Sequence, residues 1–576
     1  MTYKNSKSSC YVREYNGFDG IDRTRDSGGL SDVVNFRLMN DKSLKKREAA
    51  ILLTALEYKP RAHYVADDST LLLLSDRTVS FFNLSDLSQK TVGYTDTSAG
   101  KAQFFCYDGK IILSDGDDLY VCGNETLSHI DGYAPLYGKN WHPIEKGRVH
   151  QQMNLLSKHY RISYKIDDDD PSIFLLDEMS ESVDAAYLDG VRISERKFTV
   201  DDGGFSISCS HPMQSGSVLT LFITAVSYPY YHDALKSCSR AALYGNGSGR
   251  GADVSSVAFY NGSDPAKIFT SRRIEKADLE ETLKDYPDAM SIYVTLSDMK
   301  TVGNGRSRIT AVCRRGGKLL VFTPDSAYAL SESGDSSDLF NLSLAGGCDV
   351  PDGAASMGDS PVTVSKSGIL KWSPVRYDSD EYVAECISAP IGGLPHPSFY
   401  TSAAVHSFRS KNEIWFTDPS SSDKRIFIYN TILDAWYCFC GIHADSFFEI
   451  GGKTGYFSGN EVYLFDTETY EDISAEGTVP IVGRIVTGRI SFGSFDFKKR
   501  LFKLAILSGP RNTFDVMIDD ASGISLHVPF IDRSGEQLGY TEKRIPAARS
   551  RYYTVSLTTL SKNEDRLLGM TMTAAK

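Results

Sequence analysis

Short strand–turn–strand units recur along most of this 576-residue chain. Two are especially clear, residues 317–330 and residues 425–439, and each places an apolar strand, a polar turn and an aromatic-rich second strand in succession. Radial repetition of such hairpins is the pattern of a β-propeller. The pattern therefore predicts an all-β fold, and it indicates that function can lie in assembly rather than in a catalytic site.

Composition and length extend this prediction. Aromatic residues make up 11% of the chain, which favours strands, and 47 glycines can supply many tight turns. A chain of this length exceeds a single hydrophobic core. We expect an irregular β-propeller of about 6–8 blades, with an inserted small β-sandwich and a C-terminal β-sandwich.

The rhythm of strands and turns predicts five segments. Hairpin turns are marked by Asp108-Gly109, Asp115-Gly116 and Asp189-Gly190, because glycine accepts a positive φ. Residues 276–284 are the best candidate for a helix, and it is short. The predicted segments are an N-terminal extension with the first propeller strands (1–60), a first propeller segment (61–147), the inserted β-sandwich (148–236), a second propeller segment (237–478) and the C-terminal β-sandwich (479–576).

The net charge of −12 argues against a protein that wraps nucleic acid. Short basic clusters nevertheless occur, and such clusters are typical of solvated turns or of interfaces. Two of them supply the candidate assembly-contact residues, Lys45, Lys46, Arg47, Lys498, Lys499 and Arg500.

The ten cysteines are scattered, without a CxxC pair, so neither a zinc site nor any other metal site is expected. Most lie in apolar strands, as small buried side chains in a reducing compartment would. No apolar run approaches the length of a membrane helix, and the N-terminus lacks the apolar region of a secretory signal. We expect no membrane segment and no cofactor.

Three motifs suggest chemistry but fit simpler explanations better. Residues 245–251 are rich in glycine, yet a strand follows where a phosphate-binding loop needs a helix, so a hairpin tip is favoured. Residues 167–170 are four aspartates without the remaining EF-hand ligands, which favours a solvated loop over a calcium site. Residues 365–372 are similar to the Asp-box hairpin of sialidase propellers, but Ser367 and Ile369 replace its Asp and Gly.

No nucleophile elbow, zinc-protease helix or Walker loop is present, so we expect no catalytic residues and no enzyme activity. The sequence leaves one enzymatic alternative open. A glycosidase needs only two suitably placed carboxylates, and the chain has 74 acidic residues.

Taken in order, the motifs resemble those of a family of tailed-bacteriophage virion proteins, the tail nozzle, hub or packaged-DNA stabilisation proteins. Phe18, Gly20 and Asp22 match the opening turn of the family, and Asp32 and Asn35 match the segment that follows. Lys42 or Ser43 stands where the family has a glycine. The other matching segments are 44–47, 187–190, 198–200, 212–216, 317–330, 428–436 and 498–502.

The resemblance implies a structural virion protein made in the host cytoplasm and located in the neck or tail. Its homo-hexameric ring would lie below the portal and adaptor proteins, contact other tail proteins, continue the DNA channel and retain packaged DNA until ejection. Double-stranded DNA would pass through without sequence-specific binding. The alternatives are a glycan-binding or glycan-cleaving propeller at a receptor-binding tail tip, and a cytoplasmic propeller scaffold, which the lack of WD or kelch signatures disfavours.

Overall fold

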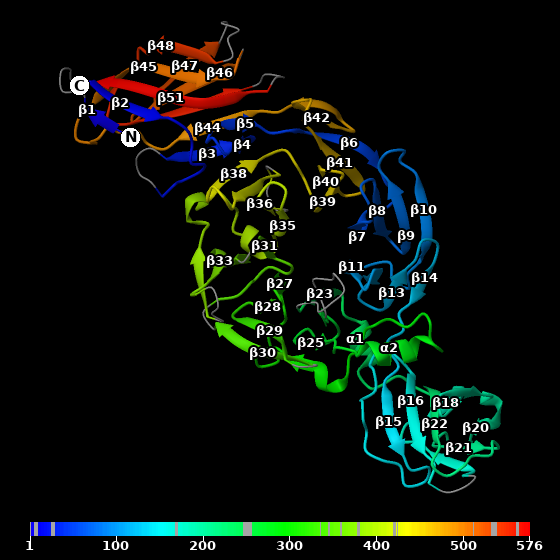
Figure 1. The fold of residues 1–576 in the computed structure, drawn as a ribbon. Coiled ribbons are helices and arrows are strands. Elements are labelled where there is room, and N and C mark those ends of the chain that lie inside the picture. The colour runs from blue at the N-terminus through cyan, green and yellow to red at the C-terminus, as the bar shows by residue number, and fades with distance from the viewer. Residues whose placement is uncertain are drawn as a thin grey trace. The chain divides into compact units, whose positions relative to one another are not determined.

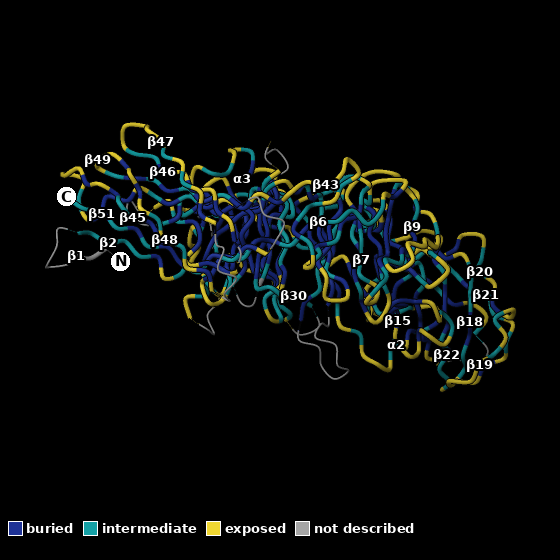
Figure 2. The backbone as a smooth tube through the Cα atoms, turned by 90° about the horizontal axis from the view of Figure 1, so that it is seen from above, coloured by how far each residue is buried: buried dark blue, intermediate teal, exposed yellow. Residues whose placement is uncertain are grey.

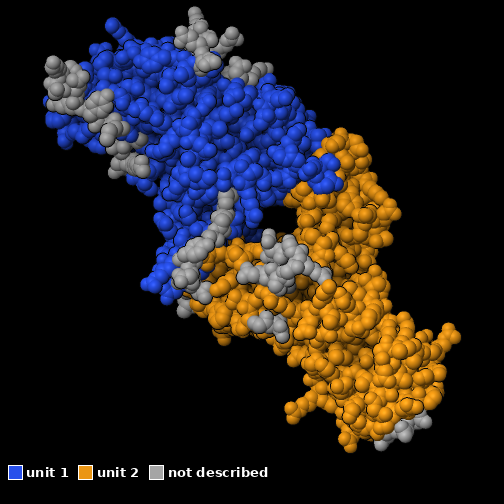
Figure 3. All heavy atoms as spheres, in the orientation of Figure 1, with its two compact units in different colours: residues 1–59, 67–69, 346–576 blue, residues 60–66, 70–345 orange. Residues whose placement is uncertain are grey.

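The computed structural model describes residues 2–4, 10–24, 29–167, 171–245, 256–333, 336–343, 346–357, 360–376, 381–418, 422, 424–510, 512–531, 538–559 and 564–576. Its regular elements are almost all strands (Figure 1), which confirms the predicted all-β class. The chain forms two compact units: unit 1 contains residues 1–59, 67–69 and 346–576, and unit 2 contains residues 60–66 and 70–345 (Figure 3).

The helices are short: α1 (His232–Lys236), α2 (Lys276–Leu283), α3 (Phe399–Ser402) and the 3-10 turns Glu195–Lys197, Leu296–Asp298 and Ala389–Ile391. The helix predicted over residues 276–284 is α2. None of the helices among the described residues has the length and apolar character needed to span a membrane.

The hairpin predicted over residues 425–439 shows why the sequence folds locally. Strands β37 (Ile426–Asn430) and β38 (Ala435–Phe439) are buried at every position and pair in register from Ile426↔Phe439 to Asn430↔Ala435. In the turn, Asp434 adopts a φ of 48° and accepts a 2.6 Å hydrogen bond from the Tyr429 hydroxyl. The polar turn thus reverses the chain while both apolar strands enter the core.

The described residues of unit 2 include four four-stranded antiparallel sheets, which are propeller blades. The first strands of these blades, β7, β11, β23 and β27, lie innermost, and each neighbours the next. The blades are β7 (Pro60–Val65), β8 (Thr70–Ser75), β9 (Thr78–Asn83) and β10 (Gln89–Tyr94); β11 (Gln103–Tyr107), β12 (Lys110–Ser114), β13 (Leu119–Cys122) and β14 (Leu127–His129); β23 (Arg240–Tyr244), β24 (Ser256–Tyr260), β25 (Lys267–Thr270) and β26 (Met299–Thr301); β27 (Ala311–Arg315), β28 (Lys318–Phe322), β29 (Ala327–Ser333) and β30 (Ser336–Ser343).

Unit 1 contains three further blades, so the described residues form seven. Their innermost strands are β31, β35 and β39, which again neighbour one another. The blades are β31 (Ala354–Met357), β32 (Ser360–Ser365), β33 (Gly368–Pro374) and β34 (Tyr382–Cys386); β35 (Ala404–Phe408), β36 (Glu413–Thr417), β37 and β38; and β39 (Ser446–Ile450), β40 (Lys453–Ser458) and β41 (Glu461–Asp466), completed by β6 (Ala49–Ala55).

The fourth strand of the last blade comes from the opposite end of the chain. Strand β6 pairs antiparallel with β41, from Glu461↔Ala55 to Asp466↔Ala49. Its other edge meets β42 (Glu471–Ser474), which pairs with β43 (Gly477–Pro480). The sequence of β6 is compatible with a helix turn or a strand in isolation, so its tertiary partners decide its conformation.

The inserted module lies between blade strands β14 and β23. A five-stranded sheet, β15 (Leu136–Trp141), β16 (His159–Lys165), β22 (Val218–Ala225), β18 (Ser180–Leu188) and β19 (Val191–Ile193), accompanies a three-stranded sheet, β17 (Ile173–Leu175), β21 (Ser206–Cys209) and β20 (Phe198–Val200). Trp141, Tyr164 and Leu221 belong to its separate hydrophobic core. The predicted boundary at residue 148 left β15 with the propeller, whereas β15 pairs with β16 in the insert.

The terminal β-sandwich uses both ends of the chain. One of its sheets has the order β1 (Thr2–Lys4), β2 (Cys10–Tyr15), β51 (Arg566–Ala575), β45 (Lys499–Ser508), β48 (Gly539–Arg544), with β5 (Leu44–Lys46) on β51, β4 (Phe36–Leu38) on β5 and β49 (Arg549–Ser550) on β45. The other has the order β3 (Leu30–Val34), β44 (Gly483–Thr487), β50 (Tyr553–Thr559), β46 (Thr513–Asp520), β47 (Ser525–Ile531). Residues 1–60, predicted as an extension with the first propeller strands, are therefore divided between this sandwich and the last blade.

Strand β3 joins the terminal sandwich to a blade. It pairs antiparallel with β44 and forms a parallel bridge to β38 through Val34 and Cys438. One hydrophobic core consequently runs through these blades and the sandwich. Figure 2 shows the blade strands mostly buried and the connecting loops mostly exposed.

The insertion of β6 between β41 and β42 predicts that Ile51→Pro will destabilise unit 1. Ile51 is flanked by Leu464 on one side and Ile473 on the other, and proline removes an N–H from a strand that is paired on both edges. We expect a loss of about 2–3 kcal/mol, against about 1 kcal/mol or less for the control Ile51→Thr, which keeps the N–H. Urea unfolding followed by the fluorescence of the unit 1 tryptophans measures both; equal losses would contradict the role of β6.

Candidate functional sites

The first candidate basic cluster is mostly buried. Lys45 forms a 2.9 Å ion pair with Glu564 and remains partly exposed. Lys46 pairs with Asp565 at 3.0 Å, and both side chains are completely buried. Arg47 is also buried, with a 2.5 Å contact from its Nη2 to Asp472. These contacts connect the N-terminal strands to the terminal sandwich and to the strand that flanks β6.

The second candidate cluster, residues 498–500, also contains both buried and exposed side chains. Lys499 is buried and donates to the carbonyl oxygens of Ser491 (2.9 Å) and Ser494 (2.7 Å), whereas Lys498 and Arg500 are exposed. A buried lysine or arginine with partners inside its own chain cannot reach another subunit. The assembly-contact prediction therefore stays with Lys45, Lys498 and Arg500.

A buried charge network that the sequence analysis missed lies beside the first cluster. Arg37, on β4, forms an ion pair with Glu413 on β36, and its Nη2 lies 3.1 Å from Glu48. Glu413 also accepts hydrogen bonds from the Trp415 indole (2.8 Å) and the Tyr437 hydroxyl (2.5 Å). Residues far apart in the sequence thus supply each other's ion-pair and hydrogen-bond partners. Motif spacing could not have predicted these pairs.

The network shifts the pKa values of Glu48 and of the nearby Lys411. Burial alone would raise the pKa of Glu48, but the positive charges of Arg37 and Lys411 lower it to about 2. Burial and the neighbouring Arg37 lower the pKa of Lys411, although the carboxylates act against them. Glu48 thus stays ionised through the ordinary pH range and keeps its ion pair with Arg37.

The terminal sandwich carries a pair of exposed apolar side chains beside a sheet edge. Leu507 and Tyr540 are direct cross-strand partners on β45 and β48, and they are 36% and 61% exposed. Strands β47 and β48 are the last strands of their sheets and lie next to each other. We call the pair Leu507 and Tyr540 the terminal apolar surface. Met517 and Ile531 are also exposed, but they alternate with core residues on the other sheet of the sandwich and face away from this pair. Exposed apolar groups beside sheet edges are typical of interaction sites.

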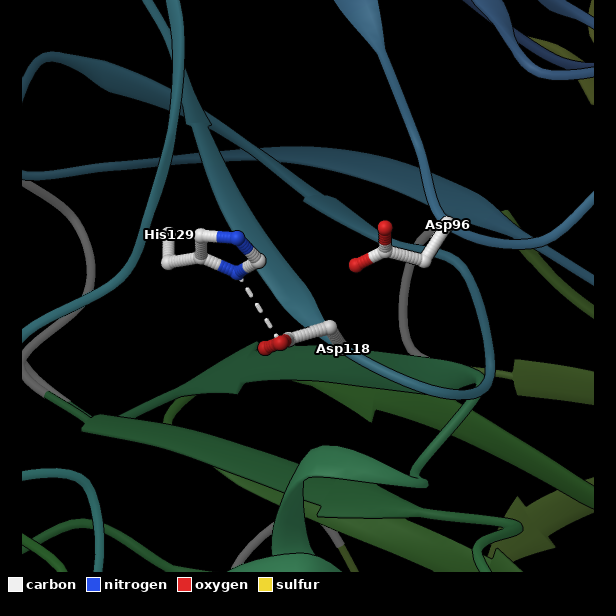
Figure 4. A group of neighbouring side chains, drawn as sticks. All are labelled: Asp96, Asp118 and His129. Atoms are coloured by element: carbon white, nitrogen blue, oxygen red, sulfur yellow. Dashed lines mark hydrogen bonds and ion pairs between the residues drawn. The ribbon is translucent and has the colours of Figure 1, made fainter.

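Asp96, Asp118 and His129 form a compact group in unit 2 (Figure 4). Their oxygen and nitrogen atoms lie close enough for a cation, but other protein groups already use them. Asp118 accepts from the backbone N–H of Leu119 at 2.7 Å, lies 2.9 Å from the His129 Nδ1 and pairs with Lys236. The geometry therefore favours an ion-pair network that ties α1 to the neighbouring blade.

A second polar cluster holds the inserted module against the rest of unit 2. The ring of His159 stacks on Tyr286 at 4.1 Å, and Tyr286 donates a 2.6 Å hydrogen bond to Asp184. Burial would raise the pKa of Asp184, but hydrogen bonds from His159, Thr224, Tyr286 and Ser182 lower it to about 2. The ionised carboxylate is therefore the form that stabilises the attachment.

A polar cavity of about 530 Å³ lies beside the hairpin of residues 317–330. Its lining comes from the end of β26 and the loop that follows it, the turn between β28 and β29, and strands β29 and β30. The residues that carry its polar groups include Asn304, Ser307, Thr323, Asp325, Tyr328 and Asn341. The described lining contains no Lys, Arg or His, and Asp325 is its one carboxylate.

The other motifs have structural surroundings or lie partly outside the described residues. Of the glycine-rich segment 245–251, only Gly245 lies among the described residues. In sequence, the segment lies between the antiparallel strands β23 and β24. Of the four aspartates at 167–170, only Asp167 is described, in an ion pair with Lys165 at 3.1 Å. In the segment similar to an Asp box, the buried Trp372 donates a 2.9 Å hydrogen bond to Thr363 within its blade.

No protein-family model and no curated protein matches the chain. Similar solved structures include the computationally designed protein Ika8 (9% identity, 73% of this chain, 100% of that chain, TM-score 0.32), the Neurospora crassa Pan2 WD40 domain (8%, 74%, 96%, 0.32) and Saccharomyces cerevisiae Sqt1 (8%, 73%, 99%, 0.33). Likeness at these TM-scores carries no argument about function. The blade assignment rests on the strand pairings of the chain itself.

The Arg37 network predicts a large effect for Arg37→Met, because the variant leaves Glu413 buried without its cation. We expect a loss of about 3–5 kcal/mol in the free energy of unfolding of unit 1, measured by urea titration. The double variant Arg37→Met/Glu413→Gln is the control, since it removes both charges and keeps an acceptor for Trp415 and Tyr437. A double variant no more stable than the single one would contradict the charge argument.

The Asp184 cluster predicts a pH dependence confined to acid. The folded-state pKa of about 2 lies below the ordinary value of about 3.9, so the stabilisation is present above pH ~4 and is lost as the pH falls toward 2. We expect about 1–2 kcal/mol, after allowance for partial exposure to solvent. Hydrogen exchange of the insert measures it between pH 2 and 6. In Asp184→Asn this step should disappear; an unchanged profile would contradict the assignment.

Proposed function

We propose that this chain is a structural virion protein of a tailed bacteriophage. It would form a ring in the neck or tail, below the portal and adaptor proteins, that continues the DNA channel and retains packaged DNA. In this proposal the chain acts by assembly and is not an enzyme.

One observation supports the proposal most strongly: two segments that carry the resemblance, 18–22 and 428–436, pack directly against each other. The backbone N–H of Ile21 donates to the carbonyl oxygen of Trp436 at 2.7 Å. Gly20 has a φ of +78°, and a Cβ there would lie 2.5 Å from the same oxygen. The opening turn therefore needs a glycine because it packs against the distant hairpin. Two matching motifs that contact each other are less easily explained by chance than two unrelated matches.

The second matching segment belongs to the same junction. Asp32 forms a 2.7 Å ion pair with Arg484, and the side chain of Asn35 accepts a 2.8 Å hydrogen bond from the backbone of Cys440. The motif residues Asp32 and Asn35 thus connect a blade to the terminal sandwich. Such a structural role is expected if the motif belongs to a shared fold.

Surface chemistry is compatible with a ring around DNA. A cyclic assembly uses heterologous contacts, and the terminal apolar surface offers one side of such a contact. A net charge of −12 disfavours a strong grip on the phosphates of a moving duplex. Lys45, Lys498 and Arg500 would then meet acidic groups of neighbouring subunits.

The alternative, a receptor-binding tail-tip protein that binds or cleaves glycans, is favoured by the polar cavity, whose described lining has no cationic side chain. Hydrolysis by the common glycosidase mechanisms requires two carboxylates flanking the bond. Asp325 is the one carboxylate among the described lining residues, so the cavity supports binding better than cleavage.

The ring proposal predicts that Tyr540→Asp weakens self-association roughly tenfold or more, because a charge would be buried in the subunit contact. Tyr230→Asp is the matched control, since Tyr230 is 90% exposed and lies outside the terminal sandwich. Native mass spectrometry measures the oligomer, and cryo-electron microscopy of particles locates the chain. A monomer that is absent from particles would overturn the proposal.

A further inference from the structure

The polar cavity beside β26 and β30 has the features of a binding site. Its volume of about 530 Å³ falls in the range of about 300–1,000 Å³ that is usual for small-molecule sites. The lining residues all belong to unit 2, so the cavity is complete within one compact unit of the chain.

Tyr328 supplies the most specific feature of the cavity. Its side chain lines the cavity while the residue is only 8% exposed, and the described residues provide no hydrogen-bond partner for its hydroxyl. The hydroxyl is not among the buried polar atoms that lack a partner, so it opens onto the solvent of the cavity. A ligand in the cavity can therefore donate a hydrogen bond to this hydroxyl or accept one from it.

The backbone around Tyr328 keeps this hydroxyl accessible. Gly303 has a φ of +63°, and a Cβ at that position would lie 2.7 Å from the Tyr328 hydroxyl oxygen. The pairing of β29 with β30 shifts register between Ala327 and Tyr328, and such bulges re-aim side chains next to functional sites.

The turn of residues 323–326, which also lines the cavity, is held in place before any ligand arrives. The backbone N–H of Thr323 donates to the carbonyl of Ser326 at 2.9 Å, and the N–H of Ser326 donates to the Thr323 hydroxyl at 3.2 Å. Asp325 lies within this turn and is exposed. A pre-ordered loop lowers the entropy that binding must overcome.

The charges and apolar surfaces of the lining define the ligand class. Hydroxyl, amide and carboxylate groups can bond to ligand hydroxyls, whereas a phosphate or sulfate would meet Asp325 without a described cation in the lining to offset it. The Tyr328 ring and Leu339 add apolar surface for C–H groups. We propose that this cavity binds an uncharged polyhydroxylated ligand, a neutral saccharide. The site does not depend on the ring proposal.

The test uses the purified full chain and saturation-transfer NMR with glucose, galactose, mannose, N-acetylglucosamine and their disaccharides, with inorganic phosphate and sialic acid as charged probes. We expect at least one neutral sugar to bind and the charged probes to fail. The best sugar is then titrated against Tyr328→Phe and Asp325→Ala, each of which should weaken binding about fivefold to tenfold.

Tyr94→Phe makes the same change at a tyrosine that is 68% exposed and distant in sequence from the cavity, and it should leave binding unchanged. Thermal melting confirms that each variant is folded, and Asp325→Ala tests the site independently because its side chain is exposed. The proposal is overturned if no neutral sugar binds at millimolar concentration, if phosphate or sialic acid binds instead, or if both cavity variants bind like the unchanged chain. Self-association is measured on the same samples, so that a failure of sugar binding can be distinguished from a failure of the ring proposal.

Discussion

The hydrogen bonds of Asn35 are the constraint on which unit 1 depends. This buried residue adopts a φ of 56°, a left-handed conformation that asparagine tolerates better than most residues. Its side-chain amide donates to the carbonyl of Val482 at 2.8 Å, and its oxygen accepts from Arg47 at 3.0 Å and from the backbone of Cys440. A single side chain therefore connects the N-terminal strands, a blade and the entry to the terminal sandwich, although these segments lie far apart in the sequence.

Charged groups, rather than apolar ones, form much of the junction around Asn35. Arg37, Lys46 and Arg47 each have a carboxylate partner from a distant segment, and removing one partner from a buried pair costs more than the intact pair contributes. Such pairs add little net stability, but a docking of the N-terminal strands that separated them would leave buried charges without partners. The register of β6 in the last blade follows from that docking, and the blade is complete only when both ends of the chain are present.

The two surfaces to which we assign function differ in chemistry and belong to different compact units. The terminal apolar surface is exposed, lies beside strand edges and suits another protein. The cavity around Tyr328 is polar, partly enclosed and suits a small uncharged ligand. A propeller can support both because its rigid strands leave the loops and the appended domains free to carry binding groups.

The amino-acid pattern alone was enough to establish the class of the fold, the blade hairpins and the existence of an insert and a terminal β-module. Alternating apolar residues and Asp-Gly turns act over a few residues, so the pairing of β37 with β38 can be read locally. Tertiary contacts were needed to show that β6 completes the last blade, that β2 to β5 join the terminal sandwich and that Lys46 and Lys499 are buried. The Arg37 network and the Tyr328 cavity were likewise invisible in the sequence. Pairing, burial and shared cavities depend on contacts between residues that can be hundreds of positions apart, and local periodicity does not encode such contacts.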